Sequence, residues 1–169
     1  MIARGKAFIA DKTPGNYHAL GLLPLLFPQC RIVHVDRDPM DTCFSILQQP
    51  FDNKSPHTFD IDLLAYSYGH YQQMLRTWRE LLGARFLTVQ YEALVASPAQ
   101  EGQRMYSHCG LEWDDRYLEF NTNPAAVHTF SAVEVRQPIS TARVGAWQRY
   151  ADALEPLRAA LEREGVALD

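Results

Sequence analysis

The stretch RIVHVDRDPMDTCFSIL, residues 31–47, contains a transition from strand to helix that organises the chain around it. Residues 31–36 are a mostly apolar run, which predicts a buried strand. A helix is expected over 39–49, because an aspartate and then a proline occupy its N-cap and first positions. Arg37 lies where the strand ends, and Ser45 lies about two helical turns beyond it. A guanidinium and a hydroxyl placed in this way can contact one bound group.

The rest of the chain also alternates between strand and helix patterns. The expected strands cover 7–11, 31–36 and 85–90, and the expected helices cover 16–27, 39–49, 61–83, 97–110 and 152–165. Asn16 is the expected N-cap of the first helix, and Gly83 is expected to end the third. Strands separated by helices predict an α/β fold with a three-layer, doubly wound parallel sheet and helices on both faces. The length fits one domain over residues 1–169.

The composition is that of a folded domain without a strong overall charge. The 169 residues are 47% hydrophobic and 21% charged, and the formal net charge is −4. This charge excludes bulk attraction to nucleic acid or to an anionic membrane. The three cysteines have no metal-ligand spacing and form no disulfide framework, so we expect reduced thiols, no metal and a cytoplasmic location. No apolar stretch approaches the roughly 18 residues of a membrane span.

A polar side chain follows each of the three expected strands. These side chains are Lys12, Arg37 and Tyr91. In parallel sheets ligands bind beyond the carboxyl ends of the strands, so the three groups are expected to meet. A lysine can neutralise a phosphate or sulfate oxygen, an arginine can bind a phosphate with two hydrogen bonds, and a tyrosine can stack on a base. The coincidence of the three predicts a nucleotide site.

Each of these residues also has a purely structural interpretation. Lys12 can be an exposed lysine at a turn, and Tyr91 can pack at the edge of the core. Arg37 can pair with a nearby carboxylate, in which case Ser45 is merely a small helix residue. The carboxylates in question are Asp36, Asp38 and Asp41.

The motifs around these residues resemble those of the sulfotransferase family. DKTPGNYHALGLLPLLFPQCRIVHVDRDPMDTCFSIL, residues 11–47, has the family's Lys-Thr-Pro-x-Asn, a helix ending in Phe-Pro, a strand, Arg-Asp-Pro and a serine eight positions after the arginine. TVQYEALVASP, residues 88–98, is similar to the family's Tyr-Glu-x-Leu block. CGLEWDD and SAVEVRQPISTARVGAWQRYADALEPL resemble its carboxyl-terminal segments. The similarity covers nearly the whole chain and is closest to bacterial tetratricopeptide-repeat sulfotransferases and tyrosylprotein sulfotransferases.

The resemblance implies a P-loop-NTPase-like fold, no metal, and the donor 3′-phosphoadenosine 5′-phosphosulfate (PAPS), which leaves adenosine 3′,5′-bisphosphate (PAP). Arg37 and Ser45 match the family positions that hold the 3′-phosphate, and Tyr91 matches a position near the adenosine. Lys12 and Ser131 match positions that stabilise the transferring sulfuryl group.

Other positions depart from the family pattern or match it more loosely. The segment through Ser140 lines the nucleotide in the family. Arg143 stands where the repeat-containing branch often has serine, and it either supplies a displaced positive charge to the nucleotide or lies on the surface. Gln49 replaces a basic residue of the tyrosylprotein enzymes.

The sequence has no counterpart of the family's first strand, of its Ser-Gly-Thr-type 5′-phosphosulfate loop, or of the glutamate base that follows that loop. The chain therefore resembles the last two-thirds of a sulfotransferase domain, as in a fragment, a truncated gene product or a divergent remnant. Resemblance to the repeat-containing branch also suggests an upstream repeat domain in the full-length protein.

The expected function is transfer of a sulfuryl group from PAPS to a hydroxyl or amine acceptor, with little or no activity in this chain alone. The alternative is a non-catalytic module that binds a 3′-phosphoadenosine nucleotide or a protein partner. The acceptor itself is expected to meet residues 50–60, whose Pro, Asp, Asn and Ser content is typical of a loop.

Overall fold

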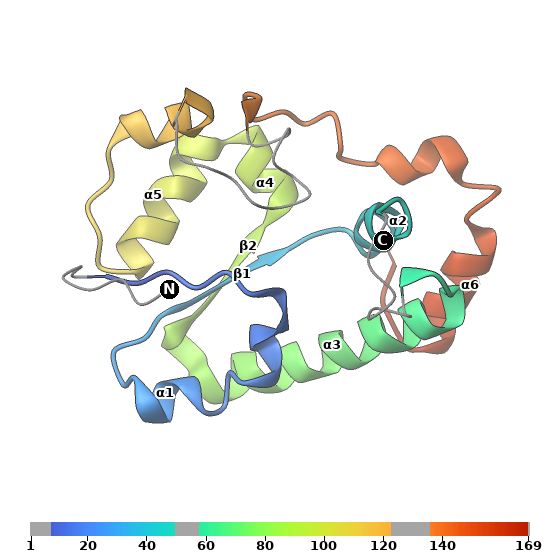
Figure 1. The fold of residues 1–169 in the computed structure, drawn as a ribbon, viewed down its shortest axis with the longest axis horizontal. Helices are drawn as coiled ribbons and strands as arrows, with labels where there is room; N and C mark the ends of the chain where they lie inside the picture. Colours follow the sequence, from blue (N-terminus) through green and yellow to red (C-terminus); the bar gives the residue numbers. More distant parts are fainter. Residues whose placement is uncertain (1–7, 50–57, 123–135, 169) are drawn as a thin grey trace.

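The structure is a computed structural model that describes residues 8–49, 58–122 and 136–168 (Figure 1). In chain order its elements, with η marking 3-10 helices, are η1 (Pro14–His18), α1 (Leu23–Leu26), β1 (Ile32–Asp36), α2 (Pro39–Leu47), α3 (Ile61–Leu82), η3 (Gly83–Arg85), β2 (Phe86–Gln90), α4 (Tyr91–Ala96), α5 (Pro98–His108), η4 (Asp115–Thr122), η6 (Ala146–Tyr150) and α6 (Glu155–Arg163).

Strands β1 and β2 form a two-stranded parallel sheet at the centre of the fold. Ile32 pairs with Phe86 and Asp36 pairs with Gln90, so the two strands end side by side. The predictions of strands over 31–36 and 85–90 are confirmed, and α2 and α3 make the crossover that parallel strands require. The arrangement agrees with the α/β class. In the part of the chain that the structure describes, the larger sheet of a doubly wound fold is not seen.

The prediction of a first strand over 7–11 is wrong for the described positions 8–11, which have no regular structure. Phe8 and Ile9 are 65% and 74% exposed. A strand forms only where a neighbour accepts its hydrogen bonds, and among the described residues β1 pairs with β2 alone.

The prediction of one helix over 16–27 is also wrong, because the segment forms the two short helices η1 and α1. Asn16 lies inside η1 and is not an N-cap. Pro24 lies in the first turn of α1, and its lack of an N–H prevents a helical hydrogen bond to the preceding turn. Gly21 lies so close to the Trp78 ring that a Cβ atom there would be 2.7 Å from it.

The remaining predicted helices are confirmed, and side chains cap the starts of α2 and α3. The Asp38 carboxylate accepts the Asp41 N–H at the start of α2, and the Asp60 carboxylate accepts the Leu63 N–H at the start of α3. Gly83 ends α3 with a φ of +49°, a backbone conformation that glycine adopts without strain. Helix α4, directly after β2, was not predicted.

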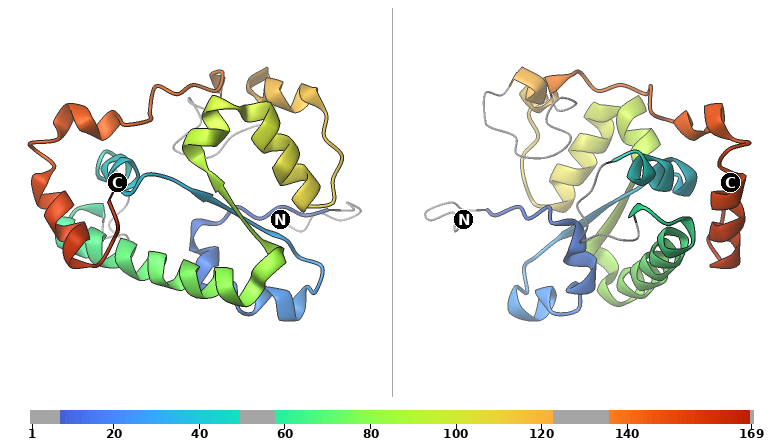
Figure 2. Two further views of the ribbon diagram at one scale, coloured as in Figure 1. Left: turned by 180° about the vertical axis from the view of Figure 1, so that it is seen from behind. Right: turned by 45° about the vertical axis from the view of Figure 1, so that its right-hand side comes forward.

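Helices α3 and α5 lie on opposite sides of the sheet in both ribbon views (Figures 1 and 2). His34 of β1 lies 2.6 Å from the Tyr71 hydroxyl of α3, and His108 of α5 lies 3.1 Å from the Ile32 carbonyl oxygen. The larger buried cluster joins α2, α3, η6 and α6 through residues that include Met40, Leu64, Trp147, Leu157 and Leu161. No helix in the described ranges is both long and apolar enough to cross a membrane.

Candidate functional site

The parallel register brings Arg37 and Tyr91 together at the carboxyl ends of the strands. The last β1 residue pairs with the last β2 residue, so these two residues are the next ones along each strand. The Arg37 guanidinium carbon lies 4.7 Å from the centroid of the Tyr91 ring. This cation–π contact fixes the plane of the guanidinium. The sequence-based expectation that these strand ends converge is confirmed for this pair.

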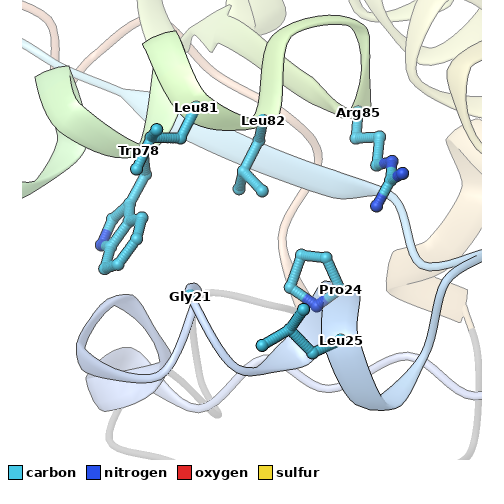
Figure 3. A pocket seen from close by; sticks show the side chains of 7 residues that line it. All are labelled: Gly21, Pro24, Leu25, Trp78, Leu81, Leu82 and Arg85. Carbon is cyan, nitrogen blue, oxygen red and sulfur yellow. The ribbon is translucent and has the colours of Figure 1, made fainter.

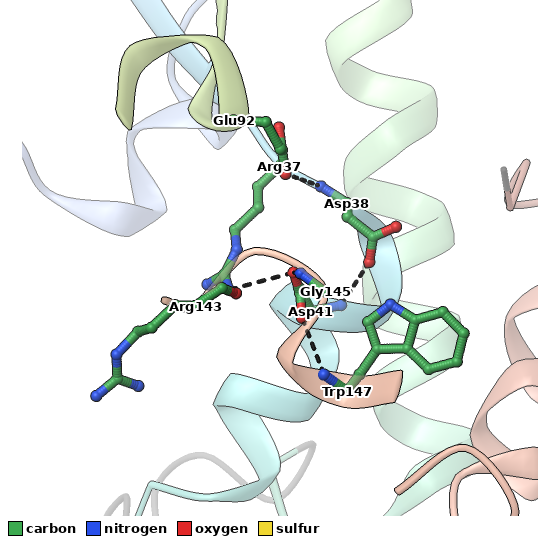
Figure 4. Close-up of polar contacts among 7 residues, drawn as sticks. All are labelled: Arg37, Asp38, Asp41, Glu92, Arg143, Gly145 and Trp147. Carbon is green, nitrogen blue, oxygen red and sulfur yellow. Dashed lines mark hydrogen bonds and ion pairs between the residues drawn. The ribbon is translucent and has the colours of Figure 1, made fainter. Parts of the chain in front are cut away.

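A buried carboxylate, Asp41, ties the same strand end to a distant segment of the chain (Figure 4). Its Oδ2 accepts the Gly145 N–H at 2.7 Å, and its Oδ1 accepts the Trp147 N–H at 3.1 Å. Oδ2 also lies 3.5 Å from Nη2 of Arg37. Nη2 in turn donates to the Arg143 carbonyl oxygen at 2.7 Å. These contacts join Arg37 and the first turn of α2 to residues 143–147.

The Arg37 side chain is only 19% exposed, and not all of its donors are used. Among the described residues, its Nε–H is buried without a hydrogen-bond partner. Orphaned buried donors are rare in proteins, so this one points to an acceptor group outside the described residues. A phosphate or sulfate oxygen is such a group, since arginine binds these anions through its planar fork.

Further carboxylates lie around this arginine. Glu92 of α4 accepts the Asp38 N–H through Oε1 at 3.1 Å. Burial raises the pKa of the Asp38 carboxyl, and the neighbouring charges of Asp41 and Glu92 raise it further. The structural alternative, in which Arg37 pairs with a nearby carboxylate, is confirmed for Asp41, which lies 3.5 Å from Nη2 of Arg37.

A pocket of about 300 Å³ opens beside Arg37. It is lined by Asp36, Arg37, Asp38, Pro39, Gln72, Arg76, Gln90, Val166 and Ala167. Arg76 of α3 brings a second guanidinium to the pocket, and the side chains of Gln72 and Gln90 supply amide donors and acceptors. The pocket therefore offers a polar ligand two guanidinium groups and two carboxylates, those of Asp36 and Asp38.

Ser45 and Lys12 are not joined to this network by any contact within the described ranges. Ser45 is half-buried in α2, one turn after Asp41 and so on the same face of the helix. Lys12 is exposed just before η1.

Of the predicted site residues near the carboxyl terminus, the structure describes Ser140 and Arg143. The Ser140 hydroxyl is exposed and accepts the Ala142 N–H. Arg143 contributes its carbonyl oxygen to Arg37, but its side chain points away from the network (Figure 4). Ser131 lies outside the described residues, as does most of the predicted acceptor loop, residues 50–57.

A second pocket, of about 310 Å³, lies at the opposite ends of the strands (Figure 3). Its lining comes mainly from α1 and the end of α3, and consists of Gly21, Pro24, Leu25, Trp78, Leu81, Leu82 and Arg85. Arg85 directly precedes β2, whereas Arg37 directly follows β1. This mostly apolar pocket is therefore separate from the Arg37 site.

Sequence reasoning missed the role of Asp41 and of the Gly145 turn. Asp41 was expected only as one of three possible carboxylate partners for Arg37. Gly145 has a φ of +67° and presents its N–H to Asp41, a pairing across 104 residues. The sequence contains Gly-Ala-Trp at 145–147, but no pattern in it pairs this turn with Asp41.

Within the described ranges, no cluster of His, Cys, Asp or Glu side chains could hold a metal ion. Burial raises the pKa of the Cys43 thiol to about 12, so this cysteine is a protonated core residue and not a ligand.

Comparison with known proteins identifies the family. The sulfotransferase family model matches residues 2–115, more than half of the chain. An uncharacterized protein of Aquifex aeolicus is 29% identical over 152 residues, which make up 88% of this chain and 20% of that protein. Omega-hydroxy-beta-dihydromenaquinone-9 sulfotransferases of Mycobacterium tuberculosis and Mycobacterium bovis are each 30% identical over 130 residues, 68% of this chain and 32% of theirs. The chain spans a third or less of the length of these relatives, and its match to the family model shows that it belongs to the sulfotransferase family.

Proposed function

We propose that this chain supplies the part of a sulfotransferase that holds the 3′-phosphate of PAPS, with Arg37 as the principal ligand. The observation that carries the proposal is the buried Arg37 Nε–H, which has no partner in the described part of the chain and lies where β1 and β2 end side by side. An unsatisfied buried donor costs about 1–3 kcal/mol, and a phosphate oxygen would satisfy it. The Tyr91 ring against the guanidinium supports the proposal, because it keeps that donor in a fixed direction.

The donor supplies an activated sulfuryl group, whose bond to the bridging phosphate oxygen breaks as an acceptor oxygen or nitrogen attacks sulfur. In this proposal Lys12 neutralises charge on the bridging oxygen and Ser131 donates a hydrogen bond to the sulfuryl oxygens. Ser45, Tyr91, Ser140 and Arg143 complete the nucleotide contacts. We assign no residue of this chain as the base that accepts the proton.

The acceptor of the full-length protein is proposed to be a hydroxyl compound. The mycobacterial relatives are named for action on a hydroxylated dihydromenaquinone, which supports a hydroxyl over an amine. Residues 50–60 follow the helix that bears Ser45, and we propose that they contact the acceptor and not the nucleotide. Deleting them should lower transfer to the acceptor while leaving PAP affinity nearly unchanged.

The 169-residue chain alone is proposed to transfer sulfate poorly, because its sequence contains no glycine-rich loop for the 5′-phosphosulfate. Loss of a single preorganised amide donor lowers turnover by about 10²–10³-fold. Incubation with labelled PAPS and a panel of phenols, peptides and hydroxylated lipids measures this. Turnover near the enzyme median of about 10 per second would contradict the proposal.

Nucleotide discrimination provides the direct test of the 3′-phosphate site. PAP and AMP differ by one phosphate, and a hydrogen bond to a charged group contributes about 1.5–3 kcal/mol. We therefore expect this chain to bind PAP about 10- to 150-fold more tightly than AMP. Arg37→Ala should remove most of the preference and change AMP affinity little, and Ser45→Ala should act in the same direction but more weakly. Calorimetry with both nucleotides measures each value.

Arg116→Ala is the matched control for loss of one positive charge. Arg116 is highly exposed and pairs with Asp114, two positions away, outside the Arg37 network. Its removal should leave the ratio of PAP to AMP affinity unchanged. Equal binding of the two nucleotides by the wild-type chain would refute the 3′-phosphate assignment.

One observation favours a second candidate function, a non-catalytic module. Nη2 of Arg37 already contacts Asp41 and the Arg143 carbonyl oxygen, and the carboxylates of Asp38 and Glu92 lie nearby. In that case Arg37 acts as a structural ion-pair partner. Arg37→Ala would then lower stability and weaken AMP and PAP binding equally.

A further inference from the structure

In the described part of the chain, the Asp41 carboxylate accepts hydrogen bonds from the backbone N–H groups of both Gly145 and Trp147. Its side chain is fully buried, and its remaining polar contact is with Nη2 of Arg37. Burying a charged carboxylate is unfavourable unless hydrogen bonds satisfy it. Both oxygens are satisfied here, so the carboxylate has a defined orientation.

We infer that Asp41 is a positioning residue for the anion site, an inference that rests on the proposed 3′-phosphate function of Arg37. Asp41 and the Arg143 carbonyl oxygen hold Nη2 of Arg37, while the neighbouring Nε–H has no partner among the described residues and can donate to a ligand. By holding the amides of Gly145 and Trp147, Asp41 fixes this turn beside Arg37 and the start of α2. One carboxylate thus sets the direction of the arginine and the position of residues 145–147.

A different role for Asp41 makes the opposite prediction. If Asp41 were only a counter-ion, its negative charge would repel a bound phosphate, and its removal would strengthen PAP binding. If it positions the site, its removal weakens PAP binding because Arg37 and residues 143–147 lose their common anchor. The sign of the change therefore separates the two roles.

Asp41→Asn is the first test, because it removes the charge and one acceptor while nearly preserving the shape. We expect the ratio of PAP to AMP affinity to fall about tenfold, equivalent to about 1.4 kcal/mol. Calorimetry at fixed ionic strength measures the ratio, and its direction of change separates the two roles, because salt screens a fully buried carboxylate only weakly.

Gly145→Ala perturbs the same turn without any change in charge. Gly145 has a φ of +67°, and an added Cβ would lie 3.3 Å from the Gln148 side chain. We expect a loss of PAP preference in the same direction as for Asp41→Asn. The matched control is Gly110→Ala, which has a similar φ of +70° but open space around its Cβ and lies at the end of α5. Gly110→Ala should lower stability without changing the preference.

Amide hydrogen exchange at Gly145 and Trp147 supplies a measurement that does not involve nucleotide. Both amides should exchange faster in Asp41→Asn than in the wild-type protein. Faster exchange together with a lost PAP preference supports the positioning role. Faster exchange with an unchanged or increased preference overturns it while the 3′-phosphate site stands. No PAP preference in the wild-type chain overturns both.

Discussion

The Arg37–Asp41 ion pair should contribute measurably to folding, and a double-mutant cycle can isolate its contribution. Two unit charges 3.5 Å apart attract each other by about 5 kcal/mol at an effective dielectric constant of about 20. Desolvation offsets part of this, because the Asp41 side chain is fully buried and that of Arg37 is 19% exposed. We expect a coupling free energy of about 1–3 kcal/mol, within the range observed for residues in one network.

The cycle uses Arg37→Met, Asp41→Asn and the double variant, with urea unfolding followed by tryptophan fluorescence. Arg37→Met alone leaves Asp41 with its two backbone partners, so the unfolding free energy should fall by about 1–3 kcal/mol. Arg163→Met with Asp62→Asn forms the control cycle, because this pair is largely exposed and should couple by about 0.2–1 kcal/mol. A coupling for Arg37 and Asp41 as small as that of the control would refute the reasoning.

Three further predictions follow from buried groups elsewhere in the fold. Burial raises the pKa of the Cys43 thiol to about 12, so in native protein at neutral pH a thiol reagent should modify the other two cysteines first and Cys43 only on unfolding. Burial lowers the pKa of His34 below about 6.5, so below that pH the unfolded chain binds a proton that the folded chain does not. The unfolding free energy should therefore fall with decreasing pH, and a pH series of urea titrations should show a smaller fall in His34→Gln. Gly102→Ala places a Cβ 2.4 Å from the Trp113 ring. This overpacking should lower the free energy of unfolding by about 1–3 kcal/mol, which outweighs the gain of roughly 1 kcal/mol from the higher helix propensity of alanine. The thermal midpoint should therefore fall.

The parts of the fold that sequence predicted correctly depend on local chemistry. The helix beginning at Pro39 has its cap in the preceding residue, and the helix ending at Leu82 has its stop in Gly83. The convergence of Arg37 and Tyr91 follows from a rule about strand ends, which needs only the strands and their parallel direction.

The parts that sequence did not predict depend on partners far along the chain. The apolar run before Lys12 has strand composition, but hydrogen-bond pairing and not composition makes a strand. The contact between Asp41 and Gly145 requires a left-handed turn to present an amide to a particular carboxylate. No periodicity or cap in either segment specifies that meeting. The proposed roles of Lys12, Ser45 and Ser140 stay predictions.

The separation of Asp41 from its partners along the chain has a consequence for the order of folding. The contacts with Gly145 and Trp147 close loops of 104 and 106 residues. Closing a flexible loop of that length costs about 4 kcal/mol of chain entropy beyond a constant, and contacts of high sequence separation slow folding. The turn of α2 that contains Asp41, by contrast, needs only its neighbours. We therefore expect α2 to acquire structure early in refolding, and the network around Arg37 to close only when the carboxyl-terminal segment docks.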